Sequence, residues 1–267
     1  MKYTESSCKT ALSRSSLPGL DYSLNPYTGC GHGCIYCYAP ATLRYAGPEP
    51  WGTFVTAKAN VPAVLEREVR RAPRGVVGIS TVTDPYQPVE AKLELTRRCL
   101  EVLLARQFPV CIQTKSALAA RDVDLIGEFR DVEVGLTVTT LDAAASALIE
   151  PGASPPEERL NTLRRLADAG IRTWAFVGPL VPGVIDGDRL ADLLAKVKDA
   201  GASKVLVDRL RLKPGLWARM EPALRERPEA LDACRKALFG DPELFSDLRA
   251  RAIEVCKGLG LECEMNY

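Results

Sequence analysis

The sequence contains a single histidine, His32, among its 267 residues. This scarcity excludes zinc sites rich in histidine, two-histidine iron sites and any Ser-His-Asp triad away from His32. No stretch approaches the ~18 uninterrupted apolar residues of a membrane-spanning helix. The first residues, MKYTESSCKT, also lack the apolar segment of a signal peptide. We therefore expect a cytoplasmic protein with no membrane partner.

A large net charge is also missing, since 35 Lys and Arg oppose 34 Asp and Glu. The chain as a whole is therefore not drawn to nucleic acid or to a membrane by charge. Apolar residues make up 46% and charged residues 26% of the chain, which is typical of a folded globular protein. The length fits one α/β barrel of about 250 residues. No segment resembles a linker, so we expect one domain over residues 1–267.

Short apolar runs alternate with amphipathic segments. The runs are rich in β-branched residues and predict buried strands at 75–83, 109–114, 132–140, 171–178 and 203–208, with a weaker strand at 21–27. The intervening segments predict helices, with a cap at Asn60, a capping box at Ser154 and Glu157, and a cap at Asp186 or Asp188. Such alternation predicts a parallel sheet. We expect an α/β fold, a partial (β/α)6 TIM-type barrel with its core at about 20–210.

The remaining residues, about 211–267, differ from this core. Their prolines separate segments with helical patterns, and one helix is predicted over 241–260, capped by Asp241 with Pro242 in its first turn. We find no seventh βα unit here. The sequence therefore predicts a helical C-terminal extension.

The strongest chemical signal is the segment 25–38, NPYTGCGHGCIYCY. Its cysteines are spaced C-x3-C-x2-C at Cys30, Cys34 and Cys37, and the interspersed glycines let the backbone fold tightly enough for thiolates to converge. Thiolates suit zinc, which needs a fourth ligand, or an iron–sulfur cluster. Buried thiols without a metal are the remaining alternative, but this segment is polar and glycine-rich. We favour a [4Fe–4S] cluster whose fourth iron stays open to an outside molecule.

This motif, with an aromatic residue before the last cysteine, resembles the signature of radical S-adenosylmethionine (SAM) enzymes. Further blocks resemble the spore photoproduct lyase-like branch, also called DNA repair photolyase-like: Tyr36-Cys37-Tyr38, Thr83-Asp84-Pro85-Tyr86-Gln87-Pro88, Thr114-Lys115-Ser116, Glu150-Pro151-Gly152 and Glu157-Glu158-Arg159-Leu160. The resemblance implies that the cluster binds SAM at its open iron. An electron from an external flavodoxin- or ferredoxin-type donor then cleaves SAM to a 5′-deoxyadenosyl radical, which abstracts hydrogen from a substrate.

The resemblance also implies roles for cofactor-binding residues. Tyr36 corresponds to an aromatic residue placed against the adenine, and Lys115 to a lysine that contacts the SAM carboxylate. Thr140, with Thr139 beside it, and Thr83 correspond to hydroxyls near SAM. Core packing for Tyr36 and a solvated surface position for Lys115 remain the alternatives. Arg159 either assists the cofactor or pairs with Glu150 or Glu157.

Three residues are candidates for contact with the substrate. Tyr38 corresponds to a tyrosine that relays a hydrogen atom in spore photoproduct lyases. Asp84 and Tyr86 face substrate in this interpretation, although the surrounding prolines also fit a simple turn. One departure is Val82, because spore photoproduct lyases carry a hydrogen-donating cysteine there. The chain therefore resembles these lyases without their usual donor.

The sequence leaves the substrate open. A nucleic acid, undergoing lesion repair or base modification, is the first hypothesis, because residues 204–227 are rich in Lys and Arg. A solvated helix face explains that stretch equally well. Radical modification of a peptide or small molecule is the second hypothesis, and a non-catalytic zinc- or cluster-binding module the third. Cys99, Cys111 and Cys256 fit core positions, whereas Cys234 and Cys263 have no predicted role.

Overall fold

An open eight-stranded sheet forms the centre of the molecule. The structure, a computed structural model, describes residues 1–240 and 243–266. The strand order is β11-β10-β9-β8-β7-β6-β3-β2, and every pairing is parallel except that of β2 with β3. The strands are β2 (Leu12–Arg14), β3 (Tyr22–Leu24), β6 (Val77–Ile79), β7 (Val110–Thr114), β8 (Val132–Thr137), β9 (Arg172–Leu180), β10 (Lys204–Arg209) and β11 (Glu262–Met265). The predicted α/β fold with a parallel sheet is confirmed, and the edge strands β2 and β11 leave it open.

Each predicted apolar run overlaps one of these strands, from β3 to β10, and β9 and β10 extend beyond the ends of their runs. The reason is visible in β8, where all residues except Glu133 are buried, as expected of a parallel strand covered on both faces. β6 is shorter than its run of 75–83. It ends before Ser80, whose φ of 65° turns the chain into a loop. That loop, residues 80–89, lies at the carboxyl end of the strand.

The prediction that no further βα unit follows residue 210 was wrong. Helix α11 (Glu243–Leu259) leads into β11, which pairs in parallel with β10, Cys263 opposite Val205. β11 has two exposed glutamates and no fully buried residue, so it lacks the apolar run that marks the central strands. The predicted cap at Asp241 and Pro242 lies outside the described residues.

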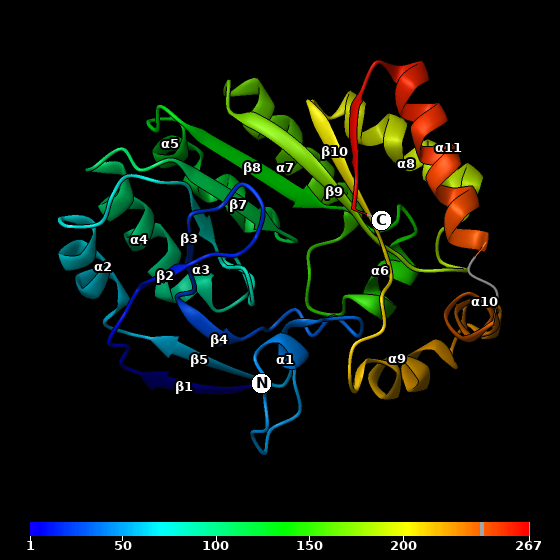
Figure 1. The fold of residues 1–267 in the computed structure, drawn as a ribbon, viewed down its shortest axis with the longest axis horizontal. Coiled ribbons are helices and arrows are strands. Elements are labelled where there is room, and N and C mark those ends of the chain that lie inside the picture. The colour runs from blue at the N-terminus through cyan, green and yellow to red at the C-terminus, as the bar shows by residue number, and fades with distance from the viewer. Residues whose placement is uncertain (241–242, 267) are drawn as a thin grey trace.

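A small second sheet carries the segment that leads to the cysteines. It has the order β1-β5-β4, with β1 (Lys2–Ser6) parallel and β4 (Tyr27–Gly29) antiparallel to β5 (Phe54–Lys58). In Figure 1 this sheet lies beneath the large one, with the short helix α1 (Ala39–Thr42) beside it. Because β4 ends at Gly29, the second sheet fixes the start of the cysteine segment.

Helices flank the large sheet: α2 (Val61–Val69), α3 (Glu90–Leu93), α4 (Leu95–Leu104), the 3-10 helix η1 (Ala117–Asp122), α5 (Val123–Ile126), α6 (Ala143–Ile149), α7 (Pro156–Asp168) and α8 (Gly187–Asp199). The cap at Asp186 is confirmed, since its carboxylate accepts from the Arg189 amide at 2.9 Å. Asn60 stands at the N-cap of α2 as predicted, but its side chain bonds the backbone of Cys8 and not the helix. The capping box at Ser154 was wrong, since Pro155 precedes α7 and the Ser154 hydroxyl accepts from the Ala117 amide. Among the described residues, no helix has the length and apolarity to span a membrane.

The C-terminal extension is helical, as predicted, and packs on the rest of the chain. Helices α9 (Leu216–Leu224) and α10 (Pro228–Phe239) precede α11, on the right of Figure 1. Their apolar side chains form a second core with α6 and with Tyr36 of the cysteine segment. Because this core joins the extension to the central part of the chain, we expect both to unfold together.

The substitution Met220→Ala tests this coupling. Met220 is fully buried in the second core, so its truncation should lower the free energy of unfolding by about 2–5 kcal/mol. Urea denaturation followed by circular dichroism and by tryptophan fluorescence should give one shared transition. As a control, Ile253→Ala alters a side chain that is 46% exposed on α11 and should change little. Two separate transitions would contradict a single domain.

Candidate active site

The cysteines lie on a loop, residues 30–38, between β4 and α1. The loop begins at Gly29, whose φ is +81° and where a Cβ would stand 2.4 Å from the Phe54 carbonyl oxygen. Only glycine fits this conformation and this contact. Within the loop, the Gly33 amide donates to the Cys30 carbonyl at 3.3 Å and the Cys37 amide to the Cys34 carbonyl at 3.2 Å. These turns place Cys30, Cys34 and Cys37 along one compact segment.

The loop after β6 holds the cysteine loop from one side. The Thr83 hydroxyl donates to the Gly29 carbonyl at 2.5 Å, and the Gln87 amide group donates to Thr83 Oγ1 at 3.1 Å. Gln87 Oε1 accepts from the Gly31 amide at 2.8 Å. The structure therefore places Thr83 against the loop backbone. Gln87 lies in the sequence block after the strand at 75–83, where contact with substrate and a simple turn were both open, and in the structure it is fully buried and supports the cysteine loop.

The segment after α6 holds the loop from another side. The Ile35 amide donates to the Ile149 carbonyl at 3.0 Å, and the Gly152 amide to the His32 carbonyl at 2.9 Å. A Cβ on Gly152 would stand 2.2 Å from the Gly31 carbonyl oxygen. Two backbone segments thus meet without intervening side chains, and glycine at 152 permits that approach.

Asp84 lies inside this assembly, 8% exposed. Its Oδ1 accepts from the Thr114 hydroxyl at 2.6 Å and its Oδ2 from the Lys115 amide at 3.0 Å, with His32 Nδ1 3.3 Å from Oδ2. Burial would raise the pKa of Asp84, but His32, Thr114 and Lys115 together lower it to about 2. Asp84 thus ties the end of β7 to the cysteine loop as an anion.

Tyr86 is fully buried beside Asp122. Burial and that carboxylate raise the pKa of its hydroxyl. Tyr38 lies differently: it is 50% exposed, and its hydroxyl donates to the Thr81 carbonyl at 2.6 Å. Of the three residues predicted to meet substrate, Tyr38 is the accessible one.

A buried ion pair fixes Tyr36. Its hydroxyl donates to Glu150 Oε1, which also accepts from the Thr139 hydroxyl at 2.7 Å. Glu150 Oε2 lies 2.6 Å from Arg159 Nη1, and both side chains are fully buried. Of the alternatives for Arg159, the structure thus shows the pairing with Glu150. Since three groups converge on one carboxylate, the orientation of the Tyr36 ring is strongly constrained.

Lys115 joins this network to the cysteines. Its Nζ lies 5.7 Å from the centroid of the Tyr36 ring. Burial acts to lower the pKa of Lys115. The combined effect of Cys34, Glu150 and Asp84 is larger and opposite, so the pKa lies above its ordinary value. For Glu150 burial acts to raise the pKa, whereas Arg159 and Lys115 bring it below its ordinary value. Lys115 is therefore charged at neutral pH, and its ammonium group lies beside the Tyr36 ring of the cysteine loop.

Thr140 is buried just beyond the carboxyl end of β8. Its Oγ1 accepts from the Asp142 amide at 3.1 Å, and Asp142 in turn caps α6. Together, Thr83, Lys115 and Thr140 follow the carboxyl ends of β6, β7 and β8. Parallel barrels build their sites at this edge. The structure therefore brings the predicted cofactor residues and the cysteine loop to one edge of the sheet.

The other cysteines lie elsewhere. Cys99 and Cys256 are buried in the main core, and Cys111 lies on β7. Cys234 is fully buried in the second core, and Cys263 lies on the edge strand β11 near Cys256. Among residues 1–240 and 243–266, no three His, Cys, Asp or Glu side chains are placed to hold one metal ion.

One contact to the cysteine loop, from Arg219, could not be predicted from the sequence. Arg219 of α9 donates through Nη2 to the Cys37 carbonyl, across 182 residues of sequence. It belongs to the basic stretch 204–227, but composition could not distinguish it from its neighbours. Lys204, Arg211 and Arg227 of that stretch are engaged by carboxylates.

This combination of an open parallel α/β sheet and a three-cysteine loop at its carboxyl edge defines the radical SAM class of enzymes. The family model described as the radical SAM superfamily matches residues 24–206, and the chain belongs to this superfamily. It is therefore an enzyme. The family implies an iron–sulfur cluster and SAM as cofactors.

Comparisons with known proteins give relatives over most of the chain. An uncharacterised protein of Mycobacterium tuberculosis is 35% identical over 264 residues, covering 91% of this chain and 77% of that one. One of Methanocaldococcus jannaschii is 34% identical over 178 residues, covering 67% of each chain. The solved structure of a spore photoproduct lyase mutant matches with a TM-score of 0.74 at 16% identity, covering 99% of this chain and 82% of that one. This likeness shows the shared fold.

The substitution Glu150→Gln tests the buried ion pair. It leaves Arg159 without a counter-charge, so at pH 7 the free energy of unfolding should fall by about 3–5 kcal/mol. The folded-state pKa of Glu150 lies below its ordinary value of 4.5, so its charge stabilises the fold above that pH. As pH falls through the folded pKa, the wild type loses this contribution and the difference should shrink.

Urea denaturation of both proteins between pH 7 and pH 3 measures this effect. Glu254→Gln is the control, because Glu254 is 72% exposed in its pair with Arg251, and should cost less than about 1 kcal/mol. An equal loss for the two variants, or one independent of pH, would contradict the role of Glu150.

Proposed function

We propose that this enzyme binds a [4Fe–4S] cluster through Cys30, Cys34 and Cys37, binds SAM beside it, and removes a hydrogen atom from a nucleic-acid substrate. The observation that carries the proposal is the placement of the cysteine loop at the carboxyl edge of the sheet, with Lys115 Nζ 5.7 Å from the ring of Tyr36, which lies between Cys34 and Cys37 in the sequence. The loop supplies thiolates, and Lys115 supplies a cation where an anionic group of SAM would bind.

The donor set fits a cluster better than a zinc ion. Structural zinc needs four convergent ligands, and the described residues offer no group of even three placed around one ion. A four-iron cube instead takes each thiolate on a different iron. With the cluster and SAM bound, one electron from a reduced flavodoxin or ferredoxin would cleave SAM to methionine and a 5′-deoxyadenosyl radical that takes hydrogen from the substrate.

The chain's own residues position these groups. Lys115 pairs with the SAM carboxylate, held in place by its backbone bond to Asp84. Tyr36 offers a ring for the adenine, and its bond to Glu150 fixes the orientation of that ring. Asp84 and Arg159 act as positioning residues, because both are buried and already bonded. Tyr86 is fully buried beside Asp122.

Hydroxyl groups complete the proposed SAM site. Thr140 accepts from the Asp142 amide, so its own hydrogen remains to be donated to the ribose. The Thr139 hydroxyl already donates to Glu150, and the Thr83 hydroxyl to Gly29. Thr140 is therefore the stronger candidate for direct contact, with Thr139 and Thr83 beside it.

Tyr38 is the residue we assign to the substrate. It follows Cys37 directly, and half of its side chain is exposed. Val82 stands where spore photoproduct lyases carry a hydrogen-donating thiol, and it is half-buried on the loop after β6. The chain thus has a tyrosine hydroxyl close to the proposed cluster, but no thiol at residue 82. We infer that its reaction differs from the thymine-dimer repair carried out by those lyases.

A nucleic acid is the substrate class we favour. The fold likeness to a spore photoproduct lyase spans 99% of this chain. Arg211 and Lys213 follow the carboxyl end of β10, the edge that carries the proposed site, and both are exposed. Phosphate groups would find cations there. Asp208 already pairs with Arg211, so this contribution is modest.

The substitution Cys34→Ala tests the cluster. The wild type, reconstituted without oxygen, should hold about four irons per chain and form 5′-deoxyadenosine from SAM with a reductant. The variant should lose most of the iron and this activity, measured by metal analysis and chromatography. Cys111→Ala removes a thiol on β7 away from the loop and is the matched control. About one zinc per chain without iron would refute the proposal.

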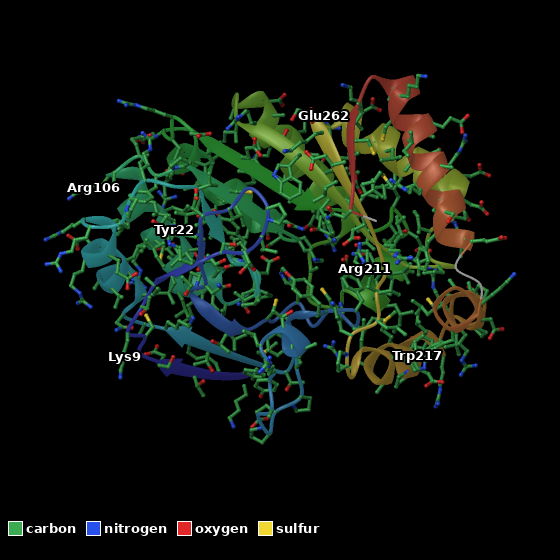
Figure 2. The ribbon with its side chains drawn as sticks, in the orientation of Figure 1. Lys9, Tyr22, Arg106, Arg211, Trp217 and Glu262 are labelled. Carbon is green, nitrogen blue, oxygen red and sulfur yellow. The ribbon has the colours of Figure 1, made fainter. Side chains whose placement is uncertain are left out.

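Salt-dependent binding tests the substrate class. Replacing Arg211 and Lys213 with Gln should weaken DNA or RNA binding and reduce the slope of log Kd against log salt by about 2. Fluorescence anisotropy at several salt concentrations measures this slope. Arg98→Gln with Arg106→Gln is the control, because Figure 2 places Arg106 on the opposite flank from Arg211. Wild-type protein without salt-dependent binding would favour a peptide or small molecule.

A further inference from the structure

Arg219 connects the C-terminal extension to the cysteine loop. Its Nη2 donates to the carbonyl oxygen of Cys37, the last of the three cysteines. This bond crosses 182 residues of sequence. The guanidinium group therefore lies beside the loop that we propose holds the cluster.

In the part of the chain that the structure describes, no ion pair joins Arg219 to a carboxylate. The side chain is half-buried, and burial lowers its pKa, while Cys37 acts in the opposite direction. A guanidinium group keeps its charge in proteins. The bond to the Cys37 carbonyl places this charge at the cysteine loop.

Helix α9 holds Arg219 in this position. Leu216, Met220 and Leu224 on the same helix are buried in the second core with Tyr36, and Cys34 and Ile35 pack against that core. Trp217 adds an edge-to-face contact with Phe239 of α10, 5.2 Å between ring centroids. Figure 2 labels Trp217, which lies on α9 within the extension. Arg219 is thus carried by a packed helix and not by a mobile loop.

We infer that Arg219 is a positioning residue that raises the reduction potential of the bound cluster, through its charge and its bond to Cys37. The inference rests on the proposed function. A cluster gains a negative charge when it takes up an electron, so a fixed cation nearby stabilises the reduced form. Lys115 lies by the ring of Tyr36, and Arg219 lies by Cys37. The loop is therefore flanked by two cations, one from the sheet and one from the extension.

The experiment compares three variants of the full chain after anaerobic reconstitution. Arg219→Gln keeps a donor for the Cys37 carbonyl but removes the charge, and Arg219→Lys keeps the charge. Arg225→Gln removes an exposed charge at the end of the same helix and is the control. Iron content is measured first, and a redox titration followed by electron paramagnetic resonance then gives the midpoint potential.

We expect Arg219→Gln to retain its iron and to hold about tenfold less reduced cluster at a fixed potential, a downward shift of about 59 mV. Arg219→Lys should stay close to the wild type, and Arg225→Gln should match it. Equal potentials for Arg219→Gln and the wild type, or an equal shift in Arg225→Gln, would overturn the inference while leaving the proposed function intact. A wild type that forms no cluster would overturn both.

Discussion

The ion pair of Glu150 with Arg159 is the interaction on which the arrangement of the site depends. Two opposite charges that are both fully buried are stable only together and only with their remaining hydrogen-bonding capacity filled. Glu150 meets this requirement by accepting from Tyr36 and Thr139, and Arg159 by donating to the carbonyls of Thr137 and Ser154. The same bonds that satisfy the charges thus connect β8, α7 and the cysteine loop.

The central strands could be predicted from the sequence because burial on both faces produces continuous apolar runs. β11 and the small sheet could not. β11 alternates exposed glutamates with partly buried residues, and β1 is exposed along its whole length. Their pairing is determined by partners distant in sequence, such as Lys2 opposite Phe54. A window of neighbouring residues contains no information about such a partner.

The same limit applies to the candidate site. The spacing of the cysteines and the position of Lys115 after a strand were visible in the sequence, because both are local features. The contacts of Thr83 with Gly29 and of Arg219 with Cys37 were not, since each joins distant segments. Asp84 shows the difference most clearly. Its place directly before Pro85 fitted either contact with substrate or a simple turn, whereas tertiary hydrogen bonds make it an interior anion.

The long separation between Cys37 and Arg219 has a consequence for biosynthesis. A ribosome adds about 5–20 residues per second. The arginine therefore emerges roughly 10–40 s after the cysteine, given the 182 residues between them. Until then the cysteine loop lacks α9 and the second core, and its thiols are more exposed than in the finished protein. The cluster proposed for this loop would therefore meet its complete protein surroundings only after the extension has been translated.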